Sequence, residues 1–261
     1  MPEGDTVWRT AQRLNHALAG RVVTRFELRV PDLALSDQRG DVVREVLARG
    51  KHILMRFASD RTLHSHLRMD GAWWLSRAAA GPRGGPRHEI RALIGNPDWL
   101  AAGYRVHDVA LVASAEERRL VGHLGPDLLG PDWDLAEAVR RLQRDPERPI
   151  GEALLDQTNL AGIGNLYKAE TLFLCGVNPW TPVVGVRDVT EVTMTAHRLL
   201  NANRDHPQQP TTGLTARGRE HWVYRRSGQP CRRCGTPIAA RVQGQPPGQR
   251  VTWWCLRCQP G

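Results

Sequence analysis

The order of apolar and polar residues predicts a helix at the start of the chain. Residues 4–20 read GDTVWRTAQRLNHALAG. The apolar residues of this stretch recur every three to four positions, the spacing of one helix face: Val7, Ala11, Leu14 and Leu18. We expect Asp5 or Thr6 to cap this helix, because either side chain can accept a backbone N–H bond, and Gly20 to end it.

From about residue 21 to 122 the pattern changes to short strand-like runs. In chain order they are RVVTRFELRV, VVREVLARG, KHILMRF, TLHSHLRM, GAWWLS, HEIRALIG and VHDVALVA. Gly, Pro and Asp separate these runs, as is typical of a sandwich or barrel of antiparallel strands. The composition of SRAAAGPRGGPRHE predicts a flexible loop within this stretch.

Helical patterns return in DWDLAEAVRRLQRD, PIGEALLDQ, NLYKAETLFLCG and VTEVTMTAHRLLNANRD, and GHLGPDLLGPDWD marks the seam before them. We therefore divide the chain into a strand-rich domain (1–122), a linker with a first helix (123–145), a helical region (146–228) and a cysteine-bearing segment (229–261). This order of elements predicts an α+β fold with two domains.

The charge of the chain indicates a polyanionic partner. It has 36 Lys and Arg against 27 Asp and Glu, a net charge of +9 and a pI near 10.1, which favours nucleic acid. The alternative is a compositional preference for arginine, because lysine occurs only as Lys51 and Lys168. A lysine kept in such a chain can release a proton or fit a tight contact where arginine cannot, so we single out both lysines.

The chain has no membrane-spanning pattern, since no run approaches roughly 18 apolar residues. Glu3 and Asp5 stand where a signal peptide would be basic and then apolar. We expect a cytoplasmic protein with no membrane association.

Four of the five cysteines form two pairs near the C-terminus. Cys231 and Cys234 are two residues apart, as are Cys255 and Cys258, and twenty residues separate the pairs. This spacing predicts a four-cysteine zinc site, and GTPIAARVQGQPPGQRVTWW reads as two strands and a turn, hence a zinc ribbon. A reducing cytoplasm disfavours the alternative of disulfides, and the strand–turn–strand insert does not support an iron–sulfur site. Four thiolates leave no open position, so we predict one structural zinc ion, with Cys175 as a small core residue.

The stretch DQTNLAGIGNLYKAETLF predicts two helices joined by a glycine-bearing turn. One helix ends near Gln157 and the next begins at Asn165. Exposed N–H groups in such a turn, together with the positive end of the second helix, suit a phosphate. Asn165 can cap that helix or donate its amide to a phosphate oxygen. The pattern alone fits any helical hairpin, but beside a basic zinc ribbon it favours DNA binding.

Taken together, these motifs resemble the formamidopyrimidine-DNA glycosylase and endonuclease VIII family of base-excision repair enzymes. The resemblance covers the PEG start, RGKHIL, the helix–two-turn–helix NLAGIGNLYKAE and the ribbon with QRVTWWC. It implies a DNA glycosylase that is also an abasic-site lyase. It further implies an N-terminal β-sandwich with flanking helices, a C-terminal helix–two-turn–helix domain with a zinc ribbon, and DNA held between the domains.

The resemblance also assigns roles by position. Pro2 matches the N-terminal nucleophile and Glu3 its acid–base partner. Lys51 matches the strand lysine, Asn165 the phosphate-binding residue of the helical motif, and Arg250 the zinc-ribbon arginine. Lys168, in the same helical motif, is a further candidate for DNA contact. The nucleophile requires removal of Met1, which a small second residue such as proline usually permits.

The chemistry explains these residue types. Only a neutral amine attacks the sugar C1′ carbon, and about one α-amine in ten is neutral at pH 7, against roughly one lysine in a few thousand. Attack expels the damaged base and leaves an iminium, which allows strand cleavage by β- or β,δ-elimination. Glu3 would shuttle protons, while Lys51 and Arg250 would neutralise phosphates beside the flipped nucleotide.

Two departures from the family pattern concern the substrate. Oxidised-purine glycosylases carry an Arg-x-Phe pair just after the motif that reads VHDVALVA here, where this chain has Ala110, Leu111 and Val112. They also carry a long lesion-capping loop, and the segment between Gly213 and Pro230 is too short for one. Both departures favour oxidised pyrimidines, with oxidised purines as the alternative.

Other positions leave the substrate preference open. The stretch HLRMDG resembles the purine branch of the family. This makes Met69 a candidate for the wedge that fills the gap left by the flipped base. The alternative is that Met69 is a core residue of a strand. Thr6 stands where endonuclease VIII has a second glutamate. We interpret His64, His66 and His88 as packing or DNA-facing residues, since no carboxylate or cysteine lies at metal-ligand spacing.

Two hypotheses compete with the enzyme. One is a damaged-DNA-binding protein that has lost the chemistry, and the presence of Pro2, Glu3 and Lys51 together disfavours it. The other is a generic zinc-ribbon module, which leaves the first 220 residues unexplained. The enzyme hypothesis predicts a monomer that acts on damaged DNA, either double- or single-stranded. We expect it to associate with the bacterial nucleoid in the cytoplasm.

Overall fold

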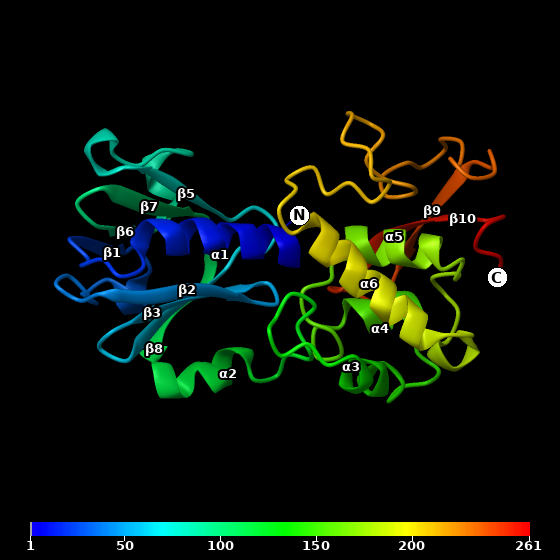
Figure 1. Ribbon diagram of the computed structural model, residues 1–261, viewed down its shortest axis with the longest axis horizontal. Coiled ribbons are helices and arrows are strands. Elements are labelled where there is room, and N and C mark those ends of the chain that lie inside the picture. The colour runs from blue at the N-terminus through cyan, green and yellow to red at the C-terminus, as the bar shows by residue number, and fades with distance from the viewer. Residues whose placement is uncertain (1) are drawn as a thin grey trace. The chain divides into compact units, whose positions relative to one another are not determined.

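The computed structural model describes residues 2–261 and forms two compact units (Figure 1). The first unit ends at His123, and the second comprises Leu124–Gly261. Met1, whose removal the nucleophile requires, lies outside the described residues.

The first unit contains two four-stranded antiparallel sheets, with strand orders β1-β6-β7-β5 and β2-β3-β4-β8. The strands are β1 (Arg25–Leu28), β2 (Val43–Arg49), β3 (His52–Phe57), β4 (Arg61–His66), β5 (Ala72–Arg77), β6 (Ile90–Gly95), β7 (Trp99–Tyr104) and β8 (His107–Ala113). Helices α1 (Gly4–Leu18) and α2 (Glu117–Val121) flank them. Residues of α1 and of both sheets share one buried cluster, so the predicted β-sandwich with flanking helices is confirmed.

Helix α1 begins earlier than the sequence analysis expects. Glu3 is its N-cap residue, and the backbone carbonyl of Glu3 accepts the Val7 N–H at 3.0 Å. Asp5 lies inside the first turn, fully buried, and forms an ion pair with Arg9 at 3.1 Å. Neither Asp5 nor Thr6 is therefore the cap. The four predicted stripe residues of α1 are all buried against the sandwich.

Strand β7 is absent from the sequence prediction. The centre of its sequence, WLAAGY, consists of two alanines and a glycine, which have low strand propensity. The structure places β7 between β6 and β5, where small side chains are required. A Cβ atom at Gly103 would lie 3.0 Å from Val106 and 3.2 Å from the Trp73 ring. Packing rather than propensity thus determines this strand.

The second unit combines four helices with a two-stranded sheet. They are α3 (Leu135–Leu142), α4 (Ile150–Leu155), α5 (Asn165–Leu174), α6 (Val189–Asn203), β9 (Ile238–Gln243) and β10 (Arg250–Cys255). Single 3-10 turns lie at Pro31–Leu33, Ala78–Ala80, Arg87–Glu89, Ser114–Glu116 and Val183–Gly185 across both units. Within residues 2–261, no helix is both long and apolar enough to cross a membrane.

The turn between α4 and α5 is held together by one side chain. The Gln157 amide donates to the carbonyls of Leu155 (2.8 Å) and Ile163 (3.1 Å), and its oxygen accepts the Gly162 N–H at 3.1 Å. Gly162 has φ +100, a left-handed conformation that other residues rarely adopt. The N-cap of α5 is Gly164, so Asn165 is the first helical residue rather than the cap.

The segment that leads into the ribbon is fastened to α5 by the buried carboxylate of Glu170. One oxygen accepts the backbone N–H groups of Val223 (2.9 Å) and Tyr224 (2.8 Å). The other accepts the Trp222 N–H at 2.8 Å and the Thr211 hydroxyl. A single acidic side chain on a helix therefore orders a segment that has no regular structure of its own.

We predict that Glu170→Gln destabilises the second unit by about 3 kcal/mol. The glutamine would replace one accepting oxygen by an NH2 group, which would face buried N–H donors of the segment. Urea unfolding followed by tryptophan fluorescence measures the loss. Glu137→Gln is the matched control: Glu137 pairs with Arg140 and Arg141 on the surface of α3, and its replacement should cost at most about 0.5 kcal/mol. Equal effects of the two changes would contradict the role of Glu170.

Candidate nucleic-acid site

The start of the chain is anchored at the first turn of α1. Pro2 is partly exposed, whereas Glu3 is only 1% exposed. Glu3 lies at the positive end of the α1 dipole, which stabilises a carboxylate there. The same field disfavours an ammonium at Pro2 and so favours the neutral amine that a nucleophile needs.

Lys51 lies in the two-residue turn between β2 and β3, where Arg49 pairs with His52. Gly50 occupies the first position of this turn with φ +58, as such hairpin turns require. The side chain of Lys51 is half-buried, and its positive charge lies close enough to His66 to disfavour protonation of that ring.

The register between α1 and β2 brings the chain start and this turn to the same end of the first unit. The Asn15 side-chain oxygen accepts the Val46 N–H at 2.7 Å, and the Gly20 N–H donates to the Val43 carbonyl at 2.8 Å, so α1 and β2 run in opposite directions. From Asn15 back to Gly4 the helix spans about 16 Å at roughly 1.5 Å per residue. From Val46 to Lys51 the strand also spans about 16 Å at roughly 3.3 Å per residue. Figure 1 shows both ends on one side of the sandwich.

Neutral histidines pack behind the Lys51 turn. The His64 Nδ1 lies 2.8 Å from the Asp108 carbonyl, which only accepts, so this nitrogen carries the hydrogen. The His64 Nε2 must then accept from His52 Nδ1 at 2.8 Å. Burial foremost lowers the pKa of His52 to about 3 and that of His66 to about 4. These rings are therefore uncharged at neutral pH, whereas His88 is exposed and lies on a 3-10 turn outside this group.

Met69 stands at the tip of a tightly held turn between β4 and β5. Its side chain is 62% exposed, and the Gly71 N–H donates to the Leu67 carbonyl at 2.8 Å beneath it. A Cβ atom at Gly71 would lie 2.6 Å from that carbonyl oxygen, so glycine is required there.

Ion pairs hold the turn on both flanks of Met69. The Arg68 guanidinium contacts both oxygens of Asp108, at 3.0 and 2.7 Å, and this hydrogen-bonded contact lowers the pKa of Asp108. Asp70 contacts Arg105 at 3.3 Å and His107 at 3.2 Å. Arg68, Arg105 and Asp108 all have φ between 48 and 50, a strained conformation for residues other than glycine. Sequence reasoning missed Arg105, His107 and Asp108, since their link to Met69 is a contact between distant segments.

Strand β8 contains Ala110, Leu111 and Val112. These are the positions at which an Arg-x-Phe pair would be expected in an oxidised-purine glycosylase. They pair with His64, Leu63 and Thr62 of β4. The residues that face the Met69 turn are those just before them in the chain.

In the second unit, Asn165 and Arg250 lie close together. The Asn165 amide donates to the carbonyl of Val251 at 2.8 Å, which uses one of its two N–H hydrogens. Its Oδ1 is buried without a hydrogen-bond partner among the described residues. Arg250, the first residue of β10, is half-buried and donates to the Gln249 carbonyl at 2.7 Å.

Lys168 requires a correction. The sequence analysis places it among the DNA-contacting residues, but its side chain is fully buried. Its ammonium donates to the Thr252 hydroxyl at 2.5 Å, and Thr252 in turn donates to Gln243 at 3.0 Å. Together with the Asn165 contact to Val251, this bond fastens α5 to β10. Burial under the ribbon leaves Lys168 with a structural role.

The four ribbon cysteines fit a zinc ion. Their sulfur atoms all lie within 4.8 Å of one another, with 4.0 Å between Cys231 and Cys258 and 3.4 Å between Cys234 and Cys255. A tetrahedral site with Zn–S bonds of about 2.3 Å places its sulfurs about 3.8 Å apart, within this spread. Among residues 2–261 this is the one group of Cys, His, Asp and Glu placed to hold a metal ion. Zinc here cross-links two chain segments and leaves no position for a reactant.

We predict that chelation removes one zinc ion per chain and unfolds the ribbon, because the ribbon has few buried apolar residues and depends on its metal. Metal analysis and the fluorescence of Trp253 and Trp254 report the loss. Cys255→Ser should not retain zinc, whereas Cys175→Ser should retain it fully. Retention of zinc by the Cys255 variant would rule out the four-thiolate site.

Three family models match the chain in succession. The formamidopyrimidine-DNA glycosylase N-terminal domain matches residues 1–100, the H2TH domain of that glycosylase matches 124–202, and the zinc finger found in FPG and IleRS matches 228–261. The last match confirms the predicted zinc ribbon.

Solved structures share the fold over the whole chain. MutM in complex with carbocyclic 8-oxo-G containing DNA superposes with a TM-score of 0.82 at 23% identity, covering 100% of both chains. The Lactococcus lactis Fpg in complex with an oxidized pyrimidine containing DNA gives 0.81 at 22% identity, again over 100% of both chains. These likenesses confirm the predicted fold class.

Curated relatives match at full length. The chain is 51% identical to the probable endonuclease 8 2 of Streptomyces coelicolor, covering 100% of this chain and 95% of the relative. It is 44% identical to the DNA-(apurinic or apyrimidinic site) lyase Nei2 of Mycolicibacterium smegmatis, covering 99% of each. The chain thus belongs to the formamidopyrimidine-DNA glycosylase and endonuclease 8 family.

Proposed function

We propose that the protein removes oxidised bases from DNA through the amine of Pro2 and then cuts the strand at the abasic site. One observation carries this proposal: Pro2, Glu3 and the Lys51 turn lie at the same end of the first unit. The register between α1 and β2 fixes this arrangement. A nucleophile, a proton carrier and a cation for phosphate are the groups that a glycosylase and lyase needs.

The proposed reaction assigns each group a step. The neutral amine of Pro2 bonds to C1′ as the N-glycosidic bond breaks, and the base leaves with a proton. The C1′–O4′ bond then opens, with a proton delivered to the sugar oxygen, and leaves an iminium between Pro2 and C1′. This iminium acidifies the C2′ proton, and removal of that proton breaks the bond from C3′ to the phosphate oxygen. Glu3 carries protons between the sugar oxygen, water and carbon. Lys51 neutralises a phosphate beside the lesion in the first unit, and Asn165 and Arg250 contact phosphates in the second.

We further propose that oxidised pyrimidines are the preferred substrates. Two of the relatives that match at full length are named endonuclease 8 2, one of them as probable. In addition, residues 213–230 form a short irregular segment without helix or strand, which leaves little chain for covering a purine lesion. The protein acts on the chromosome in the cytoplasm, where its DNA substrate lies.

We assign Met69 the role of the wedge that fills the helix when the damaged nucleotide leaves it. Its exposure supports this role, since an exposed methionine on a rigid turn can enter a base stack without the cost of ordering the backbone. The Arg68–Asp108 pair and the strained backbone around it keep the turn in one conformation before DNA binds.

We expect borohydride to trap the protein on oligonucleotides with thymine glycol, dihydrouracil or an abasic site. Pro2→Gly should abolish trapping, because the ring that fixes the amine is lost, and so should Pro2→Gln, whose larger second residue retains Met1. Pro31→Gly, an exposed proline of the same unit, is the control and should trap normally.

Three outcomes discriminate the hypotheses. Trapping by the Pro2 variants at the wild-type level would refute the nucleophile. Cleavage at 8-oxoguanine alone would refute the pyrimidine preference. Tight binding to abasic DNA without any trapped adduct would favour the non-catalytic DNA-binding protein.

For the wedge, we predict that Asp108→Asn slows base removal about tenfold, because loss of the Arg68–Asp108 ion pair releases roughly 1.4 kcal/mol of backbone strain and lets the turn relax. Cleavage of a preformed abasic site, which needs less opening of the helix, should change about twofold or less. Single-turnover rates on the two substrates measure the difference. Asp60→Asn is the control, since Asp60 also has a positive φ (56) and pairs with an arginine, Arg44. Equal slowing on both substrates would contradict this positioning role.

A further inference from the structure

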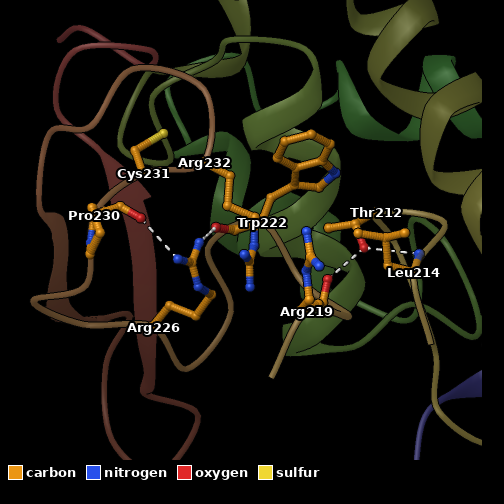
Figure 2. Close-up of a pocket in the computed structure, with 8 residues that line it drawn as sticks. All are labelled: Thr212, Leu214, Arg219, Trp222, Arg226, Pro230, Cys231 and Arg232. Carbon is orange, nitrogen blue, oxygen red and sulfur yellow. Dashed lines mark hydrogen bonds between the residues drawn. The ribbon is translucent and has the colours of Figure 1, made fainter. Parts of the chain in front are cut away.

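A hollow of about 450 Å³ opens in the irregular segment between α6 and the ribbon (Figure 2). Three arginines line it, namely Arg219, Arg226 and Arg232, together with Thr212, Leu214 and Trp222. No Asp or Glu is among the described residues that line it. The hollow lies within the second unit, and none of the phosphate-contacting residues assigned above borders it.

The hollow is part of the most strongly charged stretch of the chain. Residues 211–233 contain six arginines and a single acid, Glu220, and residues 221–261 contain seven arginines and no acid. The buried carboxylate of Glu170 uses both of its oxygens on N–H and O–H donors. Positive charge is therefore in excess here, although the Glu170 carboxylate and Cys231, a ribbon cysteine that also lines the hollow, both contribute negative charge near Arg226.

Two of the three guanidinium groups are fixed in place by uncharged partners. Arg226 donates to the carbonyls of Trp222 and Pro230 (Figure 2). It also donates to the Gln229 side chain at 3.2 Å. Arg232 donates to the carbonyls of His221 (3.0 Å) and Gly218. Carbonyl groups satisfy donors but do not cancel a charge. Burial foremost, and then the charge of Arg232, lower the pKa of Arg226, while the charges of Cys231 and Glu170 raise it.

The third guanidinium is available to a ligand. Arg219 is exposed, and within residues 2–261 its side chain forms no hydrogen bond or ion pair. Arg232 uses two of its five N–H hydrogens, which leaves three for a ligand. An anion in the hollow would relieve the repulsion between fixed cations and would satisfy these donors in a single step.

The geometry of the donors favours a phosphate. Guanidinium groups match the oxygens of phosphate with paired hydrogen bonds. The Trp222 ring, stacked on Phe173 at 5.5 Å, forms a rigid wall beside them and suits the sugar that accompanies a nucleic-acid phosphate. We propose that this hollow binds a backbone phosphate of the DNA substrate, a contact additional to those of Lys51, Asn165 and Arg250. This inference rests on the proposed function, since it takes DNA as the source of the phosphate.

The test is Arg219→Gln in the full-length, zinc-loaded protein. Duplex DNA with a non-cleavable abasic analogue is titrated over a range of salt concentrations. Loss of one phosphate contact should weaken binding about three- to tenfold at 0.1 M salt and reduce the slope of log K against log salt by about 0.9. Arg219→Lys, which keeps the charge, should restore most of the slope.

Arg217→Gln is the matched control, since it removes the same charge from an exposed arginine two positions away that does not line the hollow. It should leave the slope unchanged. Zinc content and the melting temperature should be equal in all variants, which separates the effect from misfolding. Equal slopes for Arg219→Gln and Arg217→Gln would overturn the proposal.

A second measurement distinguishes the sources of phosphate. Calorimetric titration with inorganic phosphate alone, in the wild type and in Arg219→Gln, reports a site for the free anion. Binding of free phosphate that depends on Arg219, with no change in the DNA salt slope, would overturn the assignment to DNA. An unchanged slope in Arg219→Gln while the wild type is still trapped on damaged DNA refutes this site but leaves the Pro2 chemistry intact. Absence of damaged-DNA binding by the wild type refutes both.

Discussion

The alignment of α1 with β2 is the constraint on which the proposed chemistry depends. Asn15 bonds to the backbone of Val46 and Gly20 to that of Val43, and these contacts set how far the helix extends beyond the strand. A shift of one helical turn would move Pro2 by about 5 Å relative to the Lys51 turn, more than a bond-forming step tolerates. The buried apolar face of α1 supplies the stability, while the Asn15 and Gly20 contacts supply the register.

In the second unit, the ribbon has a small apolar core of its own and is held mainly by polar contacts to α5. One short helix, α5, provides three polar anchors along its length: Asn165 and Lys168 bind successive residues of β10, and Glu170 binds the segment before the ribbon. Each anchor is buried, so its hydrogen bonds are costly to break. The zinc site then closes the far end of the ribbon. Asn165 and Arg250, the residues proposed to contact phosphate, thereby belong to rigid elements, α5 and β10.

Charge is balanced differently in two regions, the first unit around Met69 and the last 41 residues of the second unit. In the first, the arginines around Met69 are matched with aspartates and glutamates, as in Arg68 with Asp108 and Arg105 with Glu89. In the last 41 residues no acid is present, and the arginines bond to carbonyls or stack on aromatic rings, as Arg233 does on Phe173. The balanced charges around Met69 set the shape of a turn. The excess of positive charge in the last 41 residues favours a polyanionic partner.

The sequence by itself determined the local features. The apolar spacing of α1, the cysteine pairs and the Gly-bearing turn before Asn165 each depend on residues close together in the chain, so a short stretch of letters carries the whole signal. The family resemblance supplied the roles of Pro2, Glu3 and Lys51. By contrast, β7 could not be predicted from WLAAGY, because its small residues reflect crowding by neighbouring strands. The burial of Lys168, the links of Arg105, His107 and Asp108 to the Met69 turn, and the arginine-lined hollow were likewise decided only by the tertiary structure. The first two depend on contacts between segments far apart in the sequence, and the hollow depends on how one irregular segment folds back on itself. The order of residues alone does not encode which groups such folding brings together.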